Sequence, residues 1–428
     1  MMKTETISKA YEAAKETYAL YGIDTEAALK QLADIELSLH CWQGDDVTGL
    51  ESTGGGVSGG IMATGQFPGK PRNGDELRSD LDEALRLLPG KQKVNLHASY
   101  AELEGENLDR DQYETRHFQK WIDWAKAKGI GLDFNPTCFG HKMASDDLTL
   151  SHPDENVRRF WIEHCKVSRK IAADIGKALG KPCICNIWVP DGMKDMPADR
   201  MRYRTLLKNS LDEILAEQYD TDVLVDAVEC KLFGVGVESY TVGSHEFYMG
   251  YLAHAHAKGS KNLILTLDMG HFHPTETIAD KISSLLTFYP ELLIHVSRPV
   301  KWDSDHVVIS DESVQDVMRE IKRADAFNRI YLATDFFDGS INRISAWVVG
   351  LRATRRAVLA ALLEPTDMIK KAENEKNYSD RLALIEESRN LPYNAVWNKF
   401  CDMQDVPAGS DYLSDLHQYE RNVLQKRA

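Results

Sequence analysis

The chain has 428 residues, of which 43% are hydrophobic and 27% are charged, and its formal net charge is −15. This composition is ordinary for a soluble globular protein, and the acidic excess argues against nucleic acid or an anionic membrane as a partner, while it suits divalent cations and neutral substrates. The length allows either an elaborated barrel or two domains, because one (β/α)₈ barrel typically takes about 250 residues.

Residues 1–22, MMKTETISKAYEAAKETYALYG, have a charged, helical pattern and lack the long apolar segment of a signal peptide. No apolar run approaches the roughly 18 residues that a membrane span requires. The seven cysteines are scattered without a CxxC pair, which favours reduced, buried thiols. We therefore expect a cytoplasmic protein that has no membrane partner.

Short apolar, β-branched runs alternate with longer segments of helical periodicity through most of the chain. The eight predicted strands occupy residues 35–42, 93–100, 130–136, 183–190, 223–230, 263–270, 292–299 and 329–338. Apolar strands separated by helices, such as those predicted at 160–179 and 277–289, favour a parallel sheet that is buried on both faces. Eight such units predict an α/β protein with a closed (β/α)₈ TIM barrel. A doubly wound open sheet is the alternative, which the missing Rossmann fingerprint weakens.

Two segments do not fit this repeat. Residues 43–76 form a long loop rich in Gly, Ser and Asp after the first strand, which we interpret as a lid over the active-site face; a flexible surface loop is the alternative. Residues 351–428 contain only helical patterns, so we divide the chain into a barrel domain, 1–350, and a helical extension. Helices outside a complete barrel must bury their apolar faces, which predicts a homo-oligomer.

Acidic residues and a histidine end four neighbouring predicted strands, where a barrel places its chemistry. Glu229, Asp268, His295 and Asp335 come from the fifth to eighth strands, so they would converge on one point. Each has an ordinary explanation alone, such as a helix N-cap for Asp268 or a hydrogen-bonded core histidine for His295. Together, three carboxylates would repel one another and resist desolvation unless a cation bound them. The sequence therefore predicts a divalent metal site.

A second candidate ligand group follows the sixth and seventh strands. It comprises His271 in LDMGHFHP and the pair Asp303 and Asp305 in RPVKWDSDHVV, although that pair alone could serve a turn. Three protein ligands leave open positions for water or substrate, as in catalytic ions, whereas four ligands suit a structural ion. Carboxylate and imidazole ligands without thiolate favour Mn²⁺, with Mg²⁺, Co²⁺ or Zn²⁺ as substitutes. We expect two divalent ions per subunit.

Long motifs of this chain resemble those of a known family. The L-rhamnose isomerases contain motifs similar to ECKLFGVGVESYTVGSHEFYMGY, LDMGHFHPTE, HVSRPVKWDSDHVV, TDFFDGSINRISAWVVG, GGIMATGQFPGKPRN, NIWVPDGMKD and LHASYAE. These stretches spread over nearly the whole chain. The resemblance implies a (β/α)₈ barrel, a pair of divalent ions (usually Mn²⁺), a homotetramer, and interconversion of L-rhamnose with L-rhamnulose.

The resemblance also implies roles for individual residues. It assigns a structural metal site to Glu229, Asp268, His295 and Asp335, and a catalytic metal site to His271, Asp303 and Asp305. It matches Lys231, His97 and Trp188 to positions that line the sugar site, and His271 is expected to contact the substrate as well. The expected catalytic residues are Lys231, Asp303 and Asp335.

The three residues that are matched to the sugar site have expected roles in binding the substrate. Lys231 is expected to polarise the carbonyl or the O1 alkoxide, to pair with a ligand carboxylate, or both. Trp188 is expected to pack against the apolar face or the methyl group of the sugar, and His97 to hydrogen-bond a sugar hydroxyl.

The expected reaction is a metal-assisted hydrogen shift between C1 and C2 of the sugar. The resemblance favours transfer as a hydride, and an enediol formed with a general base is the open alternative. A metal-dependent hydrolase on a (β/α)₈ barrel is the rival enzyme, because fold does not determine function. A sugar-binding protein without catalysis is the third reading.

Three further histidines are assigned no metal. HAHAKGSKN, residues 254–262, departs from the family pattern like an insertion, and its His254 and His256 are expected at a surface or interface. His273 belongs to neither ligand group and is expected to have a structural or hydrogen-bonding role. Gly270 is expected to let the backbone turn between the two ions.

Overall fold

In the computed structural model, the described part of the chain comprises residues 3–43, 49–51, 65–233, 239–260 and 262–427. Eight parallel strands close into a barrel in the order β1, β12, β9, β8, β6, β4, β3, β2. Their bounds are β1 (Leu37–His40), β2 (Gln92–His97), β3 (Gly131–Asn135), β4 (Cys183–Ile187), β6 (Leu224–Glu229), β8 (Leu263–Asp268), β9 (Leu292–Val296) and β12 (Ile330–Thr334). Each lies within or beside a predicted strand, so the predicted TIM barrel is confirmed.

The barrel strands are buried on both faces because helices cover the outside and side chains fill the inside. The interior at one level is apolar, with a layer made of Ile184, Val225, Ala227, Ile264, Leu293 and Ala333. The predicted strands were too long at their carboxyl ends. The second ends at His97 because the chain turns there into the short helix η3 (Ala98–Tyr100). The eighth ends at Thr334, so Asp335 lies just beyond it.

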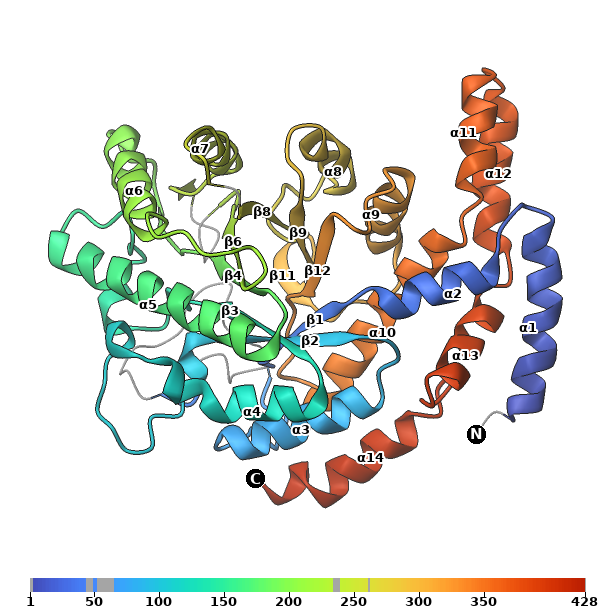
Figure 1. The fold of residues 1–428 in the computed structure, drawn as a ribbon, viewed down its shortest axis with the longest axis horizontal. Coiled ribbons are helices and arrows are strands. Elements are labelled where there is room, and N and C mark those ends of the chain that lie inside the picture. The colour runs from blue at the N-terminus through green and yellow to red at the C-terminus, as the bar shows by residue number, and fades with distance from the viewer. Residues whose placement is uncertain (1–2, 44–48, 52–64, 234–238, 261, 428) are drawn as a thin grey trace.

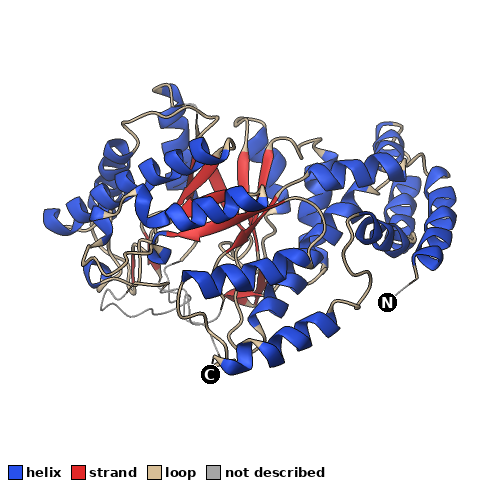
Figure 2. Cartoon of the chain, turned by 60° about the horizontal axis from the view of Figure 1, so that its bottom comes forward, coloured by secondary structure: helices blue, strands red, loops and turns tan. Residues whose placement is uncertain are grey.

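Helices surround the barrel in Figure 1 and are coloured blue in Figure 2. Those between the strands are α3 (Gly74–Arg86), α4 (Gln119–Lys128), α5 (Glu155–Leu179), α6 (Arg200–Ile214), α7 (His245–Ala257), α8 (Ala279–Leu286) and α9 (Glu312–Arg323). In α9, Val314, Val317, Met318 and Ile321 recur at helical spacing and are buried, while the Asp311 side chain caps the first turn. No helix in the described residues is long and apolar enough to cross a bilayer.

The remaining helices are α1 (Thr4–Ala19), α2 (Thr25–Asp34), α10 (Arg343–Leu362), α11 (Thr366–Asn374), α12 (Tyr378–Asn390), α13 (Tyr393–Met403) and α14 (Leu413–Asn422). Figure 1 places α1, α11, α12 and α13 at one side of the barrel with the N-terminus beside them, whereas α10 lies in the ring of helices and α14 lies along α3. The first helix, α1, packs against α13, and α10 packs against α3, α9 and β1. Because α10 runs through residue 350, the predicted division of the chain at that residue falls inside one buried helix.

Two small antiparallel ribbons were not predicted. One pairs β5 (Gly192–Met193) with β7 (Tyr240–Thr241), and the other pairs β10 (Arg298–Val300) with β11 (Trp302–His306). Asp303 and Asp305 therefore lie on a short strand after β9, where a loop was expected, and the register pairs Val300 with Trp302. Of the predicted lid, residues 44–48 and 52–64 lie outside the described residues.

Candidate metal centre and active site

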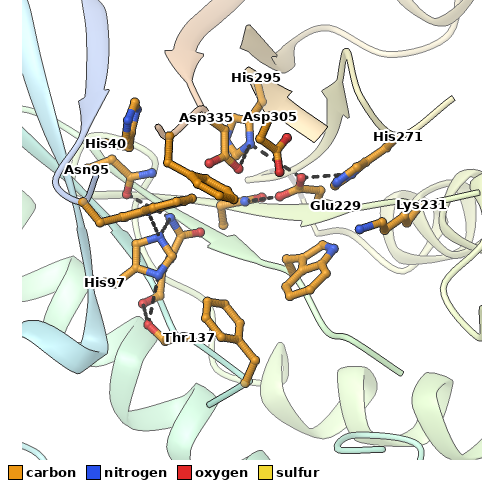
Figure 3. A pocket seen from close by; sticks show the side chains of 16 residues that line it. His40, Asn95, His97, Thr137, Glu229, Lys231, His271, His295, Asp305 and Asp335 are labelled. Carbon is orange, nitrogen blue, oxygen red and sulfur yellow. Dashed lines mark hydrogen bonds and ion pairs between the residues drawn. The ribbon is translucent and has the colours of Figure 1, made fainter. Parts of the chain in front are cut away.

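A pocket lies at the carboxyl ends of the barrel strands, and Figure 3 shows its side chains. Polar groups from most of the strands converge there, together with four large aromatic side chains. The lining residues are His40, Trp42, Asn95, His97, Asn135, Thr137, Phe139, Asn186, Trp188, Glu229, Lys231, His271, His295, Asp305, Asp335 and Phe337. In Figure 3, His97 and Thr137 lie across the pocket from His295 and Asp335. The pocket thus has a charged side and a largely aromatic side.

The structure brings together the four residues that were predicted to end the fifth to eighth strands. Each offers one ligand atom, and these atoms all lie within 4.8 Å of one another. Nδ1 of His295 is 3.6 Å from Oε1 of Glu229, 3.7 Å from Oδ2 of Asp268 and 3.6 Å from Oδ2 of Asp335. Residues Asp268 and His295 are register partners on β8 and β9, so strand pairing itself sets their separation.

Several polar atoms of this group are buried and have no hydrogen-bond partner among the residues that the structure describes. They are Oδ2 of Asp268 and both ring nitrogens of His295. The pKa of Asp268 is raised to about 7, mainly by burial and also by the negative charges of Glu229 and Asp335. The positive charges of His271 and His295 oppose this rise. Buried polar atoms are normally satisfied, so this arrangement fits a divalent cation that accepts their lone pairs.

A second group overlaps the first. Ligand atoms of Asp268, His271 and Asp303 lie within 4.8 Å of one another, so Asp268 belongs to both groups. Nδ1 of His271 is 3.0 Å from the carbonyl oxygen of Cys230. A carbonyl oxygen can only accept a hydrogen bond, so Nδ1 carries the proton, and in a neutral ring the lone pair is on Nε2. Nε2 is 3.6 Å from Oδ2 of Asp303. This tautomer leaves Nε2 free to bind a metal.

Asp305 lines the pocket but is not part of that tight group. Burial, and then the charge of Asp303, raise the pKa of Asp305 well above its ordinary range. Burial also opposes ionisation of Asp303, but the charges of Lys231 and His271 outweigh it and lower the pKa of Asp303. In addition, Oδ1 of Asp303 is buried and none of the described residues is its hydrogen-bond partner, so this group also fits a cation.

Gly270 lies between the two groups, and the need for glycine there comes from a close approach. A Cβ atom at this position would lie 2.3 Å from Oδ1 of Asp303 and 3.2 Å from Oδ1 of Asp268. The Gly270 amide also donates to Oδ1 of Asp268 at 2.6 Å. Any larger residue would therefore push Asp303 away from Asp268.

Lys231 makes the ion pair that was one of its two expected roles. Its Nζ is 2.8 Å from Oδ2 of Asp303 and 5.3 Å from the ring centroid of Trp188. Burial alone would lower the pKa of Lys231, but the charge of Asp303 outweighs burial and raises it. The ammonium group is therefore held charged at the edge of the second group. Nε1 of Trp188 is buried and has no hydrogen-bond partner in the described part of the chain.

His97 has protein partners on both ring nitrogens. Nε1 of Trp42 donates to Nε2 of His97 at 3.1 Å, and Nδ1 of His97 is 3.1 Å from Oγ1 of Thr137. Because an indole N–H only donates, Nε2 accepts and Nδ1 carries the proton. Burial lowers the pKa of His97 to about 3, so the ring is neutral. A hydrogen bond from His97 to a sugar hydroxyl would require one of these two bonds to break.

Sequence reasoning did not single out three aromatic or polar neighbours of His97. They are Trp42, Thr137 and Phe139, and all three line the pocket. Trp42 ends the first predicted strand, which is a signal that could have been used. The backbone of Thr137 has a φ of 59°, which costs a non-glycine residue roughly 1–3 kcal/mol and has no sequence signature.

The three histidines that were assigned no metal lie outside both groups. Nδ1 of His273 is 2.7 Å from Oγ1 of Thr275, and the His273 side chain is exposed. Nε2 of His256 is 2.8 Å from the carbonyl oxygen of Leu263, and His254 lies on the same helix, α7.

The sequence can also be compared with known proteins. A profile of the L-rhamnose isomerase (RhaA) family matches residues 5–427. The L-rhamnose isomerases of Salmonella paratyphi A and Salmonella typhimurium are each 52% identical to this chain over 425 residues, which is 99% of this chain and 100% of theirs. Among solved structures, a xylose isomerase domain protein from Alicyclobacillus acidocaldarius is 15% identical with a TM-score of 0.45, over 77% of this chain and 99% of that chain. This chain belongs to the L-rhamnose isomerase family.

Proposed function

We propose that this protein interconverts L-rhamnose and L-rhamnulose, using two divalent ions of which Mn²⁺ is the preferred species. Family membership supports the aldose–ketose isomerisation and does not favour a hydrolase. The observation that carries the metal dependence is the pair of overlapping ligand groups, whose buried donor atoms lack partners at one side of the pocket.

The two groups divide the work of holding the ions. Glu229, Asp268, His295 and Asp335 would hold the structural ion, and His271 and Asp303 the catalytic ion, with Asp268 shared between the two groups. Asp305, which lines the pocket, would complete the ligands of the catalytic ion. Bound there, divalent cations polarise the neighbouring sugar oxygens and stabilise the negative charge that develops on them.

The reaction moves a hydrogen from C2 to C1 and a proton from O2 to O1, so the protein must hold both oxygens beside groups that bind protons. Asp303 is paired with Lys231 through Oδ2, and its Oδ1 is left for the catalytic ion, so its proposed role is to hold that ion and Lys231 beside the sugar oxygens. Lys231 is placed to donate a hydrogen bond to O1 as charge grows there. Asp335, whose side chain is 29% exposed, faces the substrate side of the first group.

The aromatic side of the pocket fits the carbon skeleton of the sugar. Phe139 and Trp188 meet edge to face with centroids 5.6 Å apart, and Phe337 and Trp42 meet at 4.8 Å. These rings would cover the C–H faces and the methyl group and exclude water from the reacting carbons. We propose that Trp188 also donates its indole N–H, which no described residue accepts, to a sugar hydroxyl.

The assembly is proposed to be a cytoplasmic homotetramer whose other partner is only the small sugar substrate. No residue of α12 is buried in the single chain, and Figure 1 shows α11 and α12 projecting away from the barrel. Tyr378 and Leu382 are 57% and 66% exposed on this helix. Packing against another subunit would cover them.

A direct assay tests the function. The protein is dialysed against EDTA, divided, and given Mn²⁺, Mg²⁺, Co²⁺, Zn²⁺ or no metal before L-rhamnose is added. Ketose should form with Mn²⁺ and should not form without metal. Undiminished turnover after complete metal removal would contradict metal dependence. A lack of ketose with any metal, or release of hydrolysis products from glycosides, would contradict the isomerase.

A further inference from the structure

Arg110 is a buried cation that touches none of the metal-binding groups. It begins η4 (Arg110–Gln112), and its side chain is only 1% exposed. Nη1 donates to the carbonyl oxygen of Phe139 at 2.7 Å and also to that of Thr137. Nε and Nη2 both contact Oε1 of Glu51, at 2.8 and 2.7 Å. One guanidinium thus joins residue 51 to the pocket turn at residues 137–139.

The carboxylate of Glu51 is held from a second direction. Its side chain is 2% exposed, and Oε2 accepts a hydrogen bond from the hydroxyl of Tyr113 at 2.6 Å. Burial raises the pKa of Tyr113, so the phenol remains a donor. The neighbouring backbone is fixed as well, because the amide of Leu50 donates to the carbonyl of Ser99 at 2.8 Å.

The turn that Arg110 holds carries part of the pocket wall. Thr137, with its positive φ, places Oγ1 against Nδ1 of His97, and the ring of Phe139 lies against His97 and Trp188 with centroids 6.1 and 5.6 Å away. A side chain on α5 supports the turn from behind, since His164 contacts the carbonyls of Pro136 and Arg110. A strained turn persists only where its surroundings hold it.

We propose that Arg110, together with Glu51 and Tyr113, is a positioning unit that shapes the aromatic side of the sugar pocket. By holding the carbonyls of Thr137 and Phe139, it sets the distance between the aromatic wall and the metal groups on the opposite side. It therefore governs how the end of the sugar remote from C1 and C2 is held, and it leaves the metal ions untouched. This inference rests on the proposed isomerase function.

The test compares Arg110→Met, Arg110→Lys and the surface control Arg116→Met, whose side chain is 53% exposed. Each is purified with Mn²⁺, its metal content is measured, and kcat and KM are determined for L-rhamnose and for L-lyxose, which lacks the C6 methyl group. Arg110→Met should raise KM for L-rhamnose by about tenfold with kcat nearly kept, because binding is lost equally in ground and transition states. The preference for L-rhamnose over L-lyxose should fall, the metal content should be unchanged, and Arg110→Lys should be intermediate.

Three results would overturn this inference. The first is a folded Arg110→Met whose KM and sugar preference are unchanged. The second is an Arg110→Met that loses bound metal and whose kcat falls equally for both sugars. The third is an Arg116→Met with the raised KM and reduced sugar preference that are expected of Arg110→Met. If Arg110→Met does not fold, Tyr113→Phe decides, because it removes only the hydroxyl that holds Glu51. It should raise KM for L-rhamnose about two- to threefold, and an unchanged sugar preference would overturn the inference. Wild-type turnover of L-rhamnose separately decides the proposed function.

Discussion

The side chains at the charged side of the pocket control one another's ionisation. Lys231 keeps Asp303 ionised against the effect of burial, while the charge of Asp303 adds to burial in raising the pKa of Asp305. The Asp303 carboxylate therefore depends on a neighbouring cation for its charge. This arrangement explains why a lysine lies beside a group that is built to bind metal: it stabilises the carboxylate and still has hydrogens to donate to substrate.

Lys231→Met tests this role. The variant should lose kcat for L-rhamnose by at least about 100-fold, because no donor would remain to stabilise charge on O1. It should still bind Mn²⁺, because no ligand is removed and the bound ion would itself supply the positive charge that keeps Asp303 ionised. Steady-state kinetics and elemental analysis give both quantities, with Lys371→Met, which is 74% exposed on α11, as the control. Near-normal kcat would remove Lys231 from the catalytic set.

The motif LDMGHFHP offers a matched pair of histidines. His271→Ala should lower the Mn²⁺ content from about two ions to about one per chain, because the catalytic site loses its only nitrogen ligand. His273→Ala should change neither metal content nor activity, because His273 is exposed and bonded to Thr275. Elemental analysis of both variants checks this, and the reverse pattern would show that the ligand groups were divided wrongly.

At the scale of secondary-structure elements, the sequence pattern predicted the features that depend on residues close together in the chain. The eight strands and their order followed from apolar runs, and the convergence of the candidate ligands followed because strand ends meet at one edge of a barrel. The ribbon of β10 and β11 was missed, because three- and five-residue strands rich in polar residues give no apolar alternation. Trp42, His97 and Thr137 meet only through contacts between distant residues, so their network could not be read from the sequence.

The helix α10 illustrates the same limit. Its segment LRATRRAVLAALLE has a helical pattern that does not show which side chains are buried, and Arg352 and Arg355 are buried at 2% and 1% exposure. Arg355 donates to the carbonyls of Leu32 and Ile35 at 2.9 Å and of Lys91 at 2.6 Å, so it ties α10 to the chain just before β1 and β2.

Arg355→Met should lower the free energy of unfolding by roughly 3 kcal/mol, because three backbone carbonyls would lose the charged donor of a buried side chain. Activity per folded chain should be nearly unchanged, since Arg355 is remote from the pocket lining. Thermal unfolding followed by circular dichroism measures the change. Arg389→Met is the control, because its side chain is 42% exposed and pairs with an exposed Glu312, so it should cost less than about 1 kcal/mol. Equal stability of the two variants would refute this role.

For the whole molecule, the chain forms a closed barrel with extra helices gathered at one side. The first helix, α1, packs there against α13, which lies near the end of the sequence, so segments from both ends of the chain build one structure beside the barrel. Sequence pattern identified the tail as helical, but it could not show that the N-terminal helix joins it, because that contact spans most of the chain.

The exposed hairpin of α11 and α12 leads to a prediction about assembly. Sedimentation at micromolar concentration should give the mass of four chains of 48.3 kDa. Leu382→Arg should lower that mass, because it places a charge on a surface that a neighbouring subunit would cover. A wild-type protein that sediments as one chain would contradict the homotetramer.

The central claim is that two ligand groups sharing Asp268 hold two ions at one side of the sugar pocket. Anomalous diffraction from crystals grown with Mn²⁺ tests it most directly. We predict two peaks in each chain, one among Glu229, Asp268, His295 and Asp335, and one among His271, Asp303 and Asp305. A single peak at this site, or a peak bound by His273 or His254, would contradict it.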